Sequence, residues 1–558
     1  MVKDVFTVLV GGKAGEGVKK AGAVASSLFS SMGKRVFQRD DYMSLIQGGH
    51  NYTVTSTANR EVNSHYLTCE LIINSDERSY NKHKDKLAEN GLLIYNSDKI
   101  GDADGFGVPF SSLAKDHEDK DRKFSIGAVT VFASSIGLNL EETKDLIKSE
   151  YPKTGIEDNL AYASEVFEVV NPDIGGRFKV DEGDKKLPII NGNQSLSMGA
   201  IMGGLDCYYA YPMTPASSIL HFMAKNQKRF NLAVGQPENE IAVMNMAIGS
   251  AFTGARTMVG SSGGGFALMT EAYSLAGMCE APVLAVLSSR PGPASGVPTY
   301  TEQADLQYAL NVGHGDFPRI VASPGSITEA FRLSAELLDM AWKFQGPVIL
   351  LTSKHLSESW MTVDLDPDVC PWAEPKSYDD VESHENGEYL RYKYTDDGIS
   401  PLKFIPSEEL VKWNSYEHDE LGITTEEPEI VKKMHDKRHQ KLDTIKTFMK
   451  NLKTVNVYGD EGPLIFTWGS TTMSVLEAVQ YGDIEARVVQ PLYLRPFPVW
   501  EMELFKNQEV ITVELNKSGQ FTKLVQEKAG INVKKLINKY DSRPFEPTEL
   551  AQKLKEVL

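Results

Sequence analysis

The sequence predicts a multidomain α/β protein, and three observations support this fold class. The chain has 558 residues, more than a single hydrophobic core normally organises. Short apolar runs alternate with segments whose apolar residues recur every three or four positions, as strands alternate with helices. Several of these runs, such as residues 281–289, are nearly uniformly apolar and show no alternation, which is typical of parallel strands covered on both faces.

We divide the chain into three α/β units and one connecting segment. The stretch NPDIGGRFKVDEGDKKLP, rich in Gly, Pro and mixed charge, reads as a linker after the first unit. Residues 429–452 carry a highly charged helical pattern, and we expect an exposed helix that bridges two domains. The predicted boundaries are 1–175, 188–362 and 456–558 for the three units and 363–455 for the connecting segment.

Composition and charge argue against several classes of protein. A net charge of −18 disfavours a nucleic-acid partner, because neutralising phosphates takes an excess of Lys and Arg. No stretch approaches the roughly 20 consecutive apolar residues of a membrane helix, and the N-terminus lacks the apolar core of a signal peptide. The four cysteines lie far apart without a CxxC pair, so no disulfide scaffold, zinc site or iron–sulfur cluster is supported. We therefore expect a reduced, cytoplasmic protein without a membrane segment.

Two features of the first unit have alternative explanations. GGKAGEG at residues 11–17 places a Gly-rich turn between a strand and a helix, where a phosphate could bind at the helix N-terminus. The spacing is neither GxGxxG nor a Walker A motif, since Val18 stands where that motif requires Lys. A tight turn that packs the helix on the strand is the stronger explanation. His50 lies between a Gly pair and a strand, and its role stays open.

The turn YPMTPAS at residues 211–217 is more specific. Pro212 and Pro215 shape this turn ahead of a helix. Thr or Ser just before a helix normally caps it, and capping accounts for Ser217. The two prolines fix the Thr214 hydroxyl more rigidly than capping requires, so a ligand contact at Thr214 is as well supported as a cap.

Two acidic residues, Glu238 and Glu240, precede the apolar helix pattern IAVMNMAIGSAF. Acidic groups in a first helical turn complement the helix dipole, and that explanation suffices for Glu238. Glu240 starts the apolar face, so we expect its carboxyl group to be at least partly buried, which is costly without a partner. Such a group suits a cofactor that needs a short hydrogen bond to a ring nitrogen. The three glycines of SSGGGFALMTEA, residues 261–272, predict close backbone approach to a phosphate or a close-packed turn.

An arginine ends the apolar run at residues 281–289. Ligands of open α/β sheets bind beyond the carboxyl ends of parallel strands, so Arg290 stands where a ligand would bind. The loop RPGPASGVPT that follows is rich in proline, which limits its freedom to move. Because a guanidinium group matches a planar carboxylate, Arg290 is a candidate anion-binding residue.

In order and spacing, three motifs of this chain are similar to the 2-oxoacid:ferredoxin oxidoreductases: YPMTPAS, ENEIAVMNMAIGSAFTGARTMVGSSGGGFALMTEA and RPGPASGVPTYTEQADL. The particular resemblance is to the α-type subunit with a γ domain fused at its N-terminus. GGKAGEG and SLIQGGHN resemble that γ domain, and VVQPLYLRPFP and VELNKSGQ resemble the transketolase-C-terminal-like domain that ends the subunit. The resemblance covers nearly the whole chain and is weakest over residues 363–455. Met213 and Ala216 depart from the family's common YPITPSS form, which affects pocket shape.

The resemblance implies a fold, a reaction and a set of site residues. The fold is a γ-type, pyruvate/ketoisovalerate oxidoreductase catalytic-like domain, then a pyrimidine-binding-type domain of thiamine diphosphate enzymes, then transketolase-C-terminal-like domain II. Enzymes of this family use thiamine diphosphate to decarboxylate a 2-oxoacid, pass two electrons through iron–sulfur clusters to ferredoxin, and transfer the acyl group to coenzyme A. The implied residues are Glu240 for the aminopyrimidine ring, Arg290 for the substrate carboxylate, Thr299 for side-chain preference, and Pro212, Met213 and Thr214 for contacts with cofactor or substrate.

Two elements that the family needs are missing from this sequence. It contains no GDG motif with a following Asn, which binds magnesium and diphosphate in thiamine diphosphate enzymes, and no cysteine cluster for an iron–sulfur centre. The resemblance implies that a β subunit carries the Mg²⁺ site and the [4Fe-4S] cluster. We therefore expect an active site that is split across an interface, in an obligate complex of the form (αβ)2.

Two other functions stay open at this point. One is a non-redox thiamine diphosphate decarboxylase or transketolase-like subunit, against which the fused γ domain argues. The other is a non-catalytic nucleotide-binding or scaffolding subunit, which would not need Glu240, Arg290 and Thr214 together. The sequence does not distinguish pyruvate from 2-oxoglutarate as substrate, and it gives neither the direction of the reaction nor the coenzyme A contacts.

Overall fold

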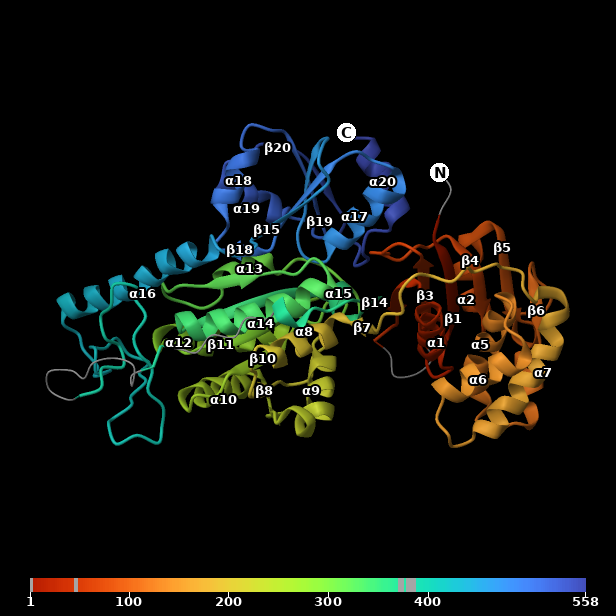
Figure 1. Ribbon diagram of the computed structural model, residues 1–558, viewed down its shortest axis with the longest axis horizontal. Coiled ribbons are helices and arrows are strands. Elements are labelled where there is room, and N and C mark those ends of the chain that lie inside the picture. Colours follow the sequence, from red (N-terminus) through yellow and green to blue (C-terminus); the bar gives the residue numbers. More distant parts are fainter. Residues whose placement is uncertain (1–3, 45–48, 370–375, 378–387) are drawn as a thin grey trace.

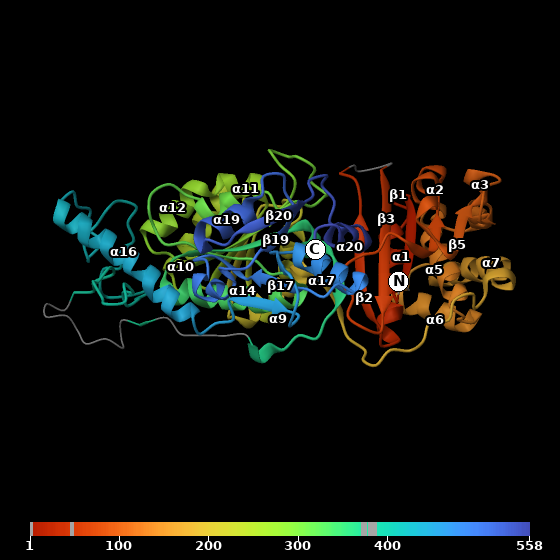
Figure 2. The ribbon, with the colours of Figure 1, turned by 90° about the horizontal axis from the view of Figure 1, so that it is seen from above.

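The computed structural model describes residues 4–44, 49–369, 376–377 and 388–558. Three α/β units lie side by side, with the first unit at one end of the molecule and the third above the second (Figure 1). A long helical arm extends from the end opposite to the first unit (Figure 2). Each unit contributes one β-sheet, and the three sheets have eight, seven and five strands.

The first sheet combines parallel and antiparallel strands in the order β6-β5-β4-β1-β3-β2-β14-β7. Its apolar strands and helices bury a core of their own, with Phe29 and Val129 among its members. The strands are β1 (Phe6–Lys13), β2 (Arg35–Asp41), β3 (His50–Ala58), β4 (Cys69–Asn74), β5 (Leu87–Asn96) and β6 (Phe106–Val108). The helices are α1 (Val18–Ser31), α2 (Glu77–His83), α3 (Ser97–Ile100), α4 (Phe110–Leu113), α5 (Lys123–Ser135), α6 (Leu140–Glu150) and α7 (Ile156–Ile174).

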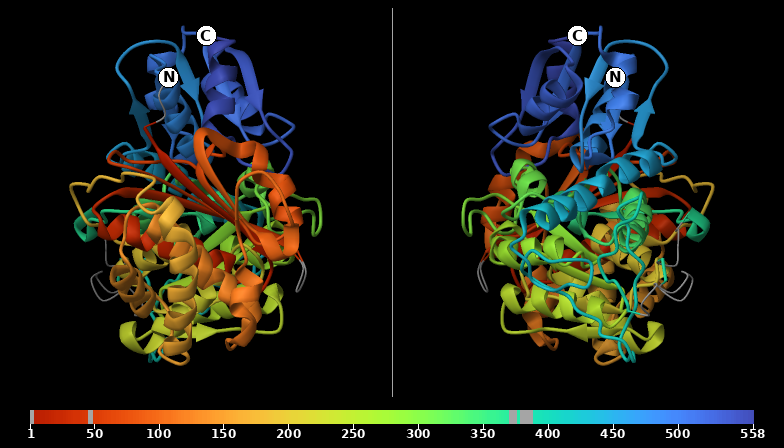
Figure 3. Two further views of the ribbon diagram at one scale, coloured as in Figure 1. Left: turned by 90° about the vertical axis from the view of Figure 1, so that its right-hand side faces the viewer. Right: turned by 90° about the vertical axis from the view of Figure 1, so that its left-hand side faces the viewer.

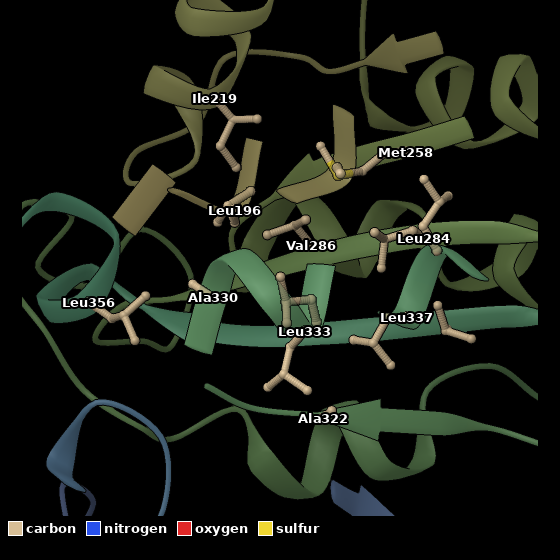
Figure 4. Close-up of a cluster of buried hydrophobic side chains, with 14 of the residues drawn as sticks. Leu196, Ile219, Met258, Leu284, Val286, Ala322, Ala330, Leu333, Leu337 and Leu356 are labelled. Carbon is tan, nitrogen blue, oxygen red and sulfur yellow. The ribbon is translucent and has the colours of Figure 1, made fainter. Parts of the chain in front are cut away.

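The second sheet has a parallel centre, as the unbroken apolar runs predict. Its order is β18-β12-β13-β11-β10-β8-β9, and β8 to β13 pair in parallel throughout. Its strands are β8 (Cys207–Tyr209), β9 (Ala233–Gly235), β10 (Thr257–Ser261), β11 (Val283–Ser289), β12 (Ile320–Ala322) and β13 (Pro347–Ser353). Its helices are α8 (Gly192–Met202), α9 (Ser217–Phe230), α10 (Glu240–Phe252), α11 (Gly263–Leu268), α12 (Thr270–Met278), α13 (Leu306–Asn311), α14 (Ile327–Phe344) and α15 (Lys354–Glu358). Leu196 of α8, Leu333 and Leu337 of α14 and Val286 of β11 belong to one buried apolar cluster (Figure 4).

The third sheet has the order β15-β17-β16-β19-β20 and lies above the second unit (Figure 3). Its strands are β15 (Val455–Tyr458), β16 (Leu464–Phe466), β17 (Arg487–Pro491), β19 (Val510–Glu514) and β20 (Val533–Asn538). Its helices are α17 (Thr471–Gly482), α18 (Val499–Met502), α19 (Gln520–Ala529) and α20 (Pro547–Lys555).

Strands near the predicted boundaries join the sheet of a neighbouring unit. β7 (Ile189–Asn191) and β14 (Trp360–Thr362), from the two ends of the second unit, extend the first sheet beyond β2. β18 (Tyr493–Arg495) of the third unit pairs with β12 in the second sheet. These strands cross the predicted boundaries, so the structure does not separate the units at single residues. The domain boundaries given by the sequence therefore stay predictions.

The arm contains α16 (Pro428–Met449), which is the helix that the sequence predicts over residues 429–452. It is not exposed on every side, because one face buries Met434, Ile445 and Met449 together with Lys437 and Lys441. None of the helices among the described residues is both long and apolar enough to cross a membrane.

A buried ion cluster fastens α16 to the second unit. Glu280, which follows α12, accepts a hydrogen bond from Lys437 Nζ at 2.6 Å and pairs with Lys441 through its second oxygen. Burial alone would raise the pKa of Glu280, but the charges of Lys437 and Lys441 hold it well below its ordinary value. The cluster explains how a charged helix is fixed against an apolar unit, because the buried carboxylate of Glu280 contacts both buried lysines.

We expect Glu280→Gln to destabilise the packing of α16 by about 3 kcal/mol, because removing one partner of a buried ion pair leaves the other charges uncompensated. The measurement is the urea dependence of unfolding. The matched control is Asp443→Asn, which breaks the exposed Lys446–Asp443 pair at 3.2 Å on the same helix and should cost much less. Equal losses in the two variants would contradict the assignment.

Candidate active site

The carboxyl ends of four neighbouring parallel strands meet at one edge of the second sheet. β9, β8, β10 and β11 are adjacent in the sheet order and run in the same direction. The segments that follow β8, β10 and β11 contain residues 211–216, 262–265 and 290–305, all singled out by the sequence. The topology therefore brings these segments to the edge where ligands bind in parallel α/β sheets.

Glu240 is the first residue of α10, which follows β9 at this edge. Asn239 caps the helix, because its side chain accepts a hydrogen bond from the N–H of Ala242 at 3.0 Å. The Glu240 side chain is only 2% exposed, which confirms the predicted burial. Its Oε1 accepts a hydrogen bond from Ser261 Oγ at 3.3 Å. Within the described ranges, its Oε2 has no hydrogen-bond partner, so one oxygen of a buried carboxyl group is available to a ligand.

The glycine turn after β10 makes the space around this carboxyl group. A Cβ on Gly265 would lie 2.2 Å from Glu240 Oε1 and 2.2 Å from Ser261 Oγ, so only glycine fits there. Ser261 also lies 3.9 Å from the sulfur of Met213, which connects the glycine turn with the YPMTPAS turn. The sequence identified the glycines but gave no role to Ser261, although it stands inside the quoted motif.

Arg290 is the first residue after β11 and is half-buried. Its Nη1 donates a hydrogen bond to the backbone oxygen of Thr214 at 2.8 Å, so the first and third turns of the site are in contact. Burial lowers the pKa of Arg290, and the charge of Asp305 acts in the opposite direction. The sequence predicts a ligand contact for the Thr214 hydroxyl, whereas the contact in the structure uses the Thr214 carbonyl. A role of the hydroxyl stays a prediction.

Asp305 is a second acidic residue at this edge that sequence reasoning missed. Its Oδ2 accepts a hydrogen bond from Ser289 Oγ at 2.6 Å, directly before Arg290 in the chain. A Cβ on Gly263 would lie 2.9 Å from the same oxygen, so the glycine turn packs against Asp305. Burial raises the pKa of Asp305, while the Ser289 hydrogen bond and the Arg290 charge lower it. The only signal in the sequence is its place in the quoted segment YTEQADL.

For the remaining predicted site residues, Thr299, Pro212 and Met213, the structure gives burial but no contact that indicates a role. Thr299 is buried, and its hydroxyl has no hydrogen-bond partner in the described part of the chain. Pro212 is exposed and Met213 is half-buried. The roles that the resemblance gives to these three residues stay predictions, because the structure shows their position and not a ligand.

The segment that follows Thr299 is held by the third unit. Gln303 is 2% exposed, and its side-chain nitrogen donates a hydrogen bond to the carbonyl of Trp468 at 2.9 Å. Its Oε1 accepts hydrogen bonds from Thr471 Oγ1 at 2.5 Å and from the N–H of Leu515 at 3.1 Å. The third unit therefore supports the loop that begins with Arg290.

The Gly-rich turn at residues 11–17 holds a carboxylate of its own. Glu16 accepts a hydrogen bond from the N–H of Lys13 at 2.8 Å, pairs with Lys99 at 2.9 Å, and contacts the Ser75 hydroxyl. A Cβ on Gly12 would lie 2.4 Å from Ser75 Oγ, so the glycine serves close packing. These contacts support the packing explanation of this turn over phosphate binding.

His50 lies at the start of β3, and residues 45–48 of the SLIQGGHN motif lie outside the described residues, as does Cys370. The Nε2 of His50 is 2.9 Å from Nε2 of His83. Burial, together with the nearby Lys82 charge, lowers the pKa of His50 to about 4, so the ring is neutral at pH 7. His50 is thus a buried, hydrogen-bonded residue in the first unit.

The fold and the site define a multidomain α/β protein that places an arginine and a buried acid at the edge of a parallel sheet where ligands bind in such folds. Comparisons with known proteins agree with this class. Residues 198–437 match the family model described as pyruvate flavodoxin/ferredoxin oxidoreductase, thiamine diphosphate-binding. Residues 7–169 match the model described as pyruvate ferredoxin/flavodoxin oxidoreductase.

Relatives of the same kind match over the full length. The chain is 28% identical to the 2-oxoacid:ferredoxin oxidoreductase subunit alpha of Sulfolobus sp, covering 99% of this chain and 96% of the relative. It is 29% identical to subunit alpha of the 2-oxoacid:ferredoxin oxidoreductase 2 of Aeropyrum pernix, covering 99% and 98%. The solved 2-oxoglutarate:ferredoxin oxidoreductase of Magnetococcus marinus, with 2-oxoglutarate, coenzyme A and succinyl-CoA bound, matches with a TM-score of 0.89 and 27% identity over 100% of both chains. The chain belongs to the 2-oxoacid:ferredoxin oxidoreductase family, as an α-type subunit with a γ-type unit at its N-terminus.

The residues at the site fit the pyrimidine half of thiamine diphosphate. Glu240 offers a carboxyl oxygen with no partner among the described residues, and Gly265 keeps side-chain atoms away from the carboxyl group. For the magnesium and diphosphate half of the cofactor, the described residues include no group of three or more His, Cys, Asp or Glu side chains that could hold a metal ion.

We expect Gly265→Ala to lower kcat by about 100-fold, since an error of an ångström in a reacting group is enough for such a loss. The added methyl group would displace the carboxyl group of Glu240 from its place beside Ser261. The measurement is 2-oxoacid turnover in the assembled enzyme.

The control is Gly346→Ala, directly before β13 at the opposite edge of the sheet, where an added Cβ meets no atom within 4 Å. It should turn over like the wild type. A wild-type rate in Gly265→Ala would show that the Glu240 position does not matter.

Proposed function

We propose that this chain is the substrate-binding and cofactor-activating subunit of an enzyme that converts a 2-oxoacid, coenzyme A and oxidised ferredoxin into acyl-CoA, CO2 and reduced ferredoxin. The observation that supports it is that Arg290 and Glu240 lie at the same edge of one sheet. Glu240 is buried and accepts a single hydrogen bond, from Ser261. Pyruvate and 2-oxoglutarate are both candidate substrates. A scaffold has no need of these two groups, and the γ-type unit at residues 7–169 argues against the non-redox alternative.

Glu240 is proposed to hold a proton at its free oxygen, in contact with the aminopyrimidine ring. Thiamine diphosphate, when bound, supplies the electron sink for loss of CO2. Ser261 keeps the carboxyl group in place through Oε1, which leaves Oε2 for the ring. The burial of Glu240 keeps water from competing for this hydrogen bond, and such contacts are stronger away from water.

Arg290 is proposed to bind the substrate carboxylate. Its hydrogen bond to the Thr214 carbonyl uses one donor and fixes the plane of the guanidinium group. Its other N–H donors have no hydrogen-bond partner among the described residues and are left for a carboxylate. Thr214, Pro212 and Met213 would line the cofactor or substrate, and Thr299 would set the preference for the substrate side chain.

A β subunit is proposed to complete the site. Large apolar side chains are exposed on and near α10 and α11, including Ile241 at 49%, Met246 at 43% and Leu268 at 50%. An exposed apolar group around a catalytic edge is typical of a protein interface. The β subunit would supply Mg²⁺, the diphosphate-binding residues and the [4Fe-4S] cluster that passes electrons to ferredoxin, in an (αβ)2 complex. The cytoplasmic location expected from the sequence stays a prediction.

Coenzyme A, a polyanion, is proposed to bind between the first and third units, beside the loop that carries Arg290. Arg39 of the first unit and Arg543 of the third both contact Asp41, and the charges of Arg39, Arg78 and Arg543 act on Lys82. Burial lowers the pKa of Lys82, and the charges of Arg543, Arg78 and Arg39 lower it further against the opposite effect of Asp41. Burial also lowers the pKa of Lys86 to about 8. A cluster of cations forms a site for an anion, and phosphate groups are the natural ligand of such a cluster.

We expect the chain, assembled with its β subunit, to reduce ferredoxin in a reaction that requires both a 2-oxoacid and coenzyme A. Glu240→Gln should lower kcat by about 1000-fold, as expected for loss of a group that moves a proton, while the complex still assembles. Turnover is followed as reduction of ferredoxin, and assembly by size-exclusion chromatography. Full activity of the chain without the β subunit, or wild-type turnover in Glu240→Gln, would refute the proposed function.

We expect Lys82→Ala to raise the KM for coenzyme A by about 10-fold and to leave the KM for the 2-oxoacid unchanged, because it removes one phosphate-binding charge. The matched control is Lys84→Ala, two residues away, since Lys84 lies over the Tyr80 ring and not in the cation cluster. Equal changes in the two variants would place coenzyme A elsewhere.

A further inference from the structure

The substrate-binding loop is anchored at its two ends and exposed in between. Residues 292–297 are exposed, whereas Arg290 at one end contacts the Thr214 carbonyl. At the other end, Thr301 Oγ1 accepts a hydrogen bond from the N–H of His355 at 3.2 Å. Tyr300 reaches across to the first unit, where its hydroxyl donates a hydrogen bond to Oδ1 of Asp41 at 3.2 Å.

Asp41, the last residue of β2, is a meeting point of all three units. Its carboxyl group is almost fully buried, and Oδ2 accepts hydrogen bonds from Arg39 Nη2 at 2.8 Å and from Tyr52 hydroxyl at 3.1 Å. Arg543 of the third unit lies 3.7 Å from Oδ2, and its guanidinium group stacks 3.5 Å above the Tyr300 ring. One carboxylate thus joins a strand of the first unit, the substrate loop of the second and a side chain of the third.

The charges around Asp41 keep it ionised. Burial would raise the pKa of Asp41, but Arg39, Arg543, Lys354 and Lys82 together hold it below its ordinary value. A hydrogen bond to a charged acceptor is stronger than one between neutral groups, and it is directional. The hydroxyl of Tyr300 is therefore held in one place, one residue beyond Thr299.

We propose that Asp41 and Tyr300 are positioning residues for the bound 2-oxoacid: the γ-type unit fixes the substrate-binding loop through this one hydrogen bond. This inference rests on the proposed function of Arg290 and its loop. The γ-type unit then takes part in substrate binding without touching the substrate. Loss of the anchor lets residues 291–300 fluctuate, so the substrate carboxylate is bound less often in the productive position, and the chemical step itself is unchanged.

The chain offers a matched pair of variants for the test. Tyr300→Phe and Tyr52→Phe each remove one hydrogen bond to the Asp41 carboxyl group, and each variant keeps the aromatic ring. Only Tyr300 belongs to the substrate loop, while Tyr52 lies in β3 of the first unit. Both variants are assembled with the β subunit, and Arg290→Ala serves as the reference for loss of carboxylate binding.

We expect Tyr300→Phe to raise the KM for the 2-oxoacid about fivefold, with kcat and the KM for coenzyme A within twofold of the wild type. Hydrogen–deuterium exchange of the peptide covering residues 291–300 should become about tenfold faster in the same complex. Tyr52→Phe should change neither quantity. Arg290→Ala should raise the same KM by about 10-fold or more.

The outcomes separate the possible failures. Equal effects of the two tyrosine variants would show that Asp41 only stabilises the junction of the units, and would overturn the proposal. An unchanged KM in Tyr300→Phe, with or without faster exchange, would overturn it too. An unchanged KM in Arg290→Ala would instead refute the proposed carboxylate site, independently of the role of Tyr300.

Discussion

The parallel order of β9, β8, β10 and β11 is the constraint on which the rest of the site depends. Parallel strands end at the same edge of a sheet, so turns that are far apart in the sequence become neighbours there. The Arg290 side chain can reach the Thr214 carbonyl only because β11 and β8 flank β10. Glycines 263 and 265 then let the middle turn pack against Asp305 on one side and Glu240 on the other.

Three buried carboxyl groups in this chain differ in their partners, and the difference indicates their use. Glu280 is matched by two buried lysines and fastens α16, which is a structural task. Asp41 is surrounded by cations and hydroxyl groups from three units and joins them. Glu240 has one serine hydroxyl and no cation within salt-bridge distance among the described residues. A buried acid that the protein itself leaves half-satisfied is expected at a ligand site.

The sequence predicted the features that depend on local pattern. The acid at the start of an apolar helix pattern led to Glu240, and the end of an unbroken apolar strand led to Arg290. Contacts between distant segments carry no such pattern: Asp41 and Tyr300 are separated by 259 positions, and nothing near either residue indicates the other. The buried face of α16 was missed for the same reason, because Lys437 and Lys441 read as solvent-exposed charges until Glu280 is placed beside them.

The position of Arg543 connects the two ligands of the proposed reaction. This residue contacts Asp41 and the Tyr300 ring, and it also belongs to the cation cluster proposed for coenzyme A. A phosphate group near Arg543 would compete with Asp41 for the same charge, whereas the hydrogen bond from Tyr300 to Asp41 uses the other carboxyl oxygen. Since the two contacts with Asp41 use different oxygens, the loop can stay anchored while Arg543 turns toward an anion. If coenzyme A binds as proposed, the use of separate carboxyl oxygens lets the γ-type unit hold the substrate loop and contact coenzyme A at the same time.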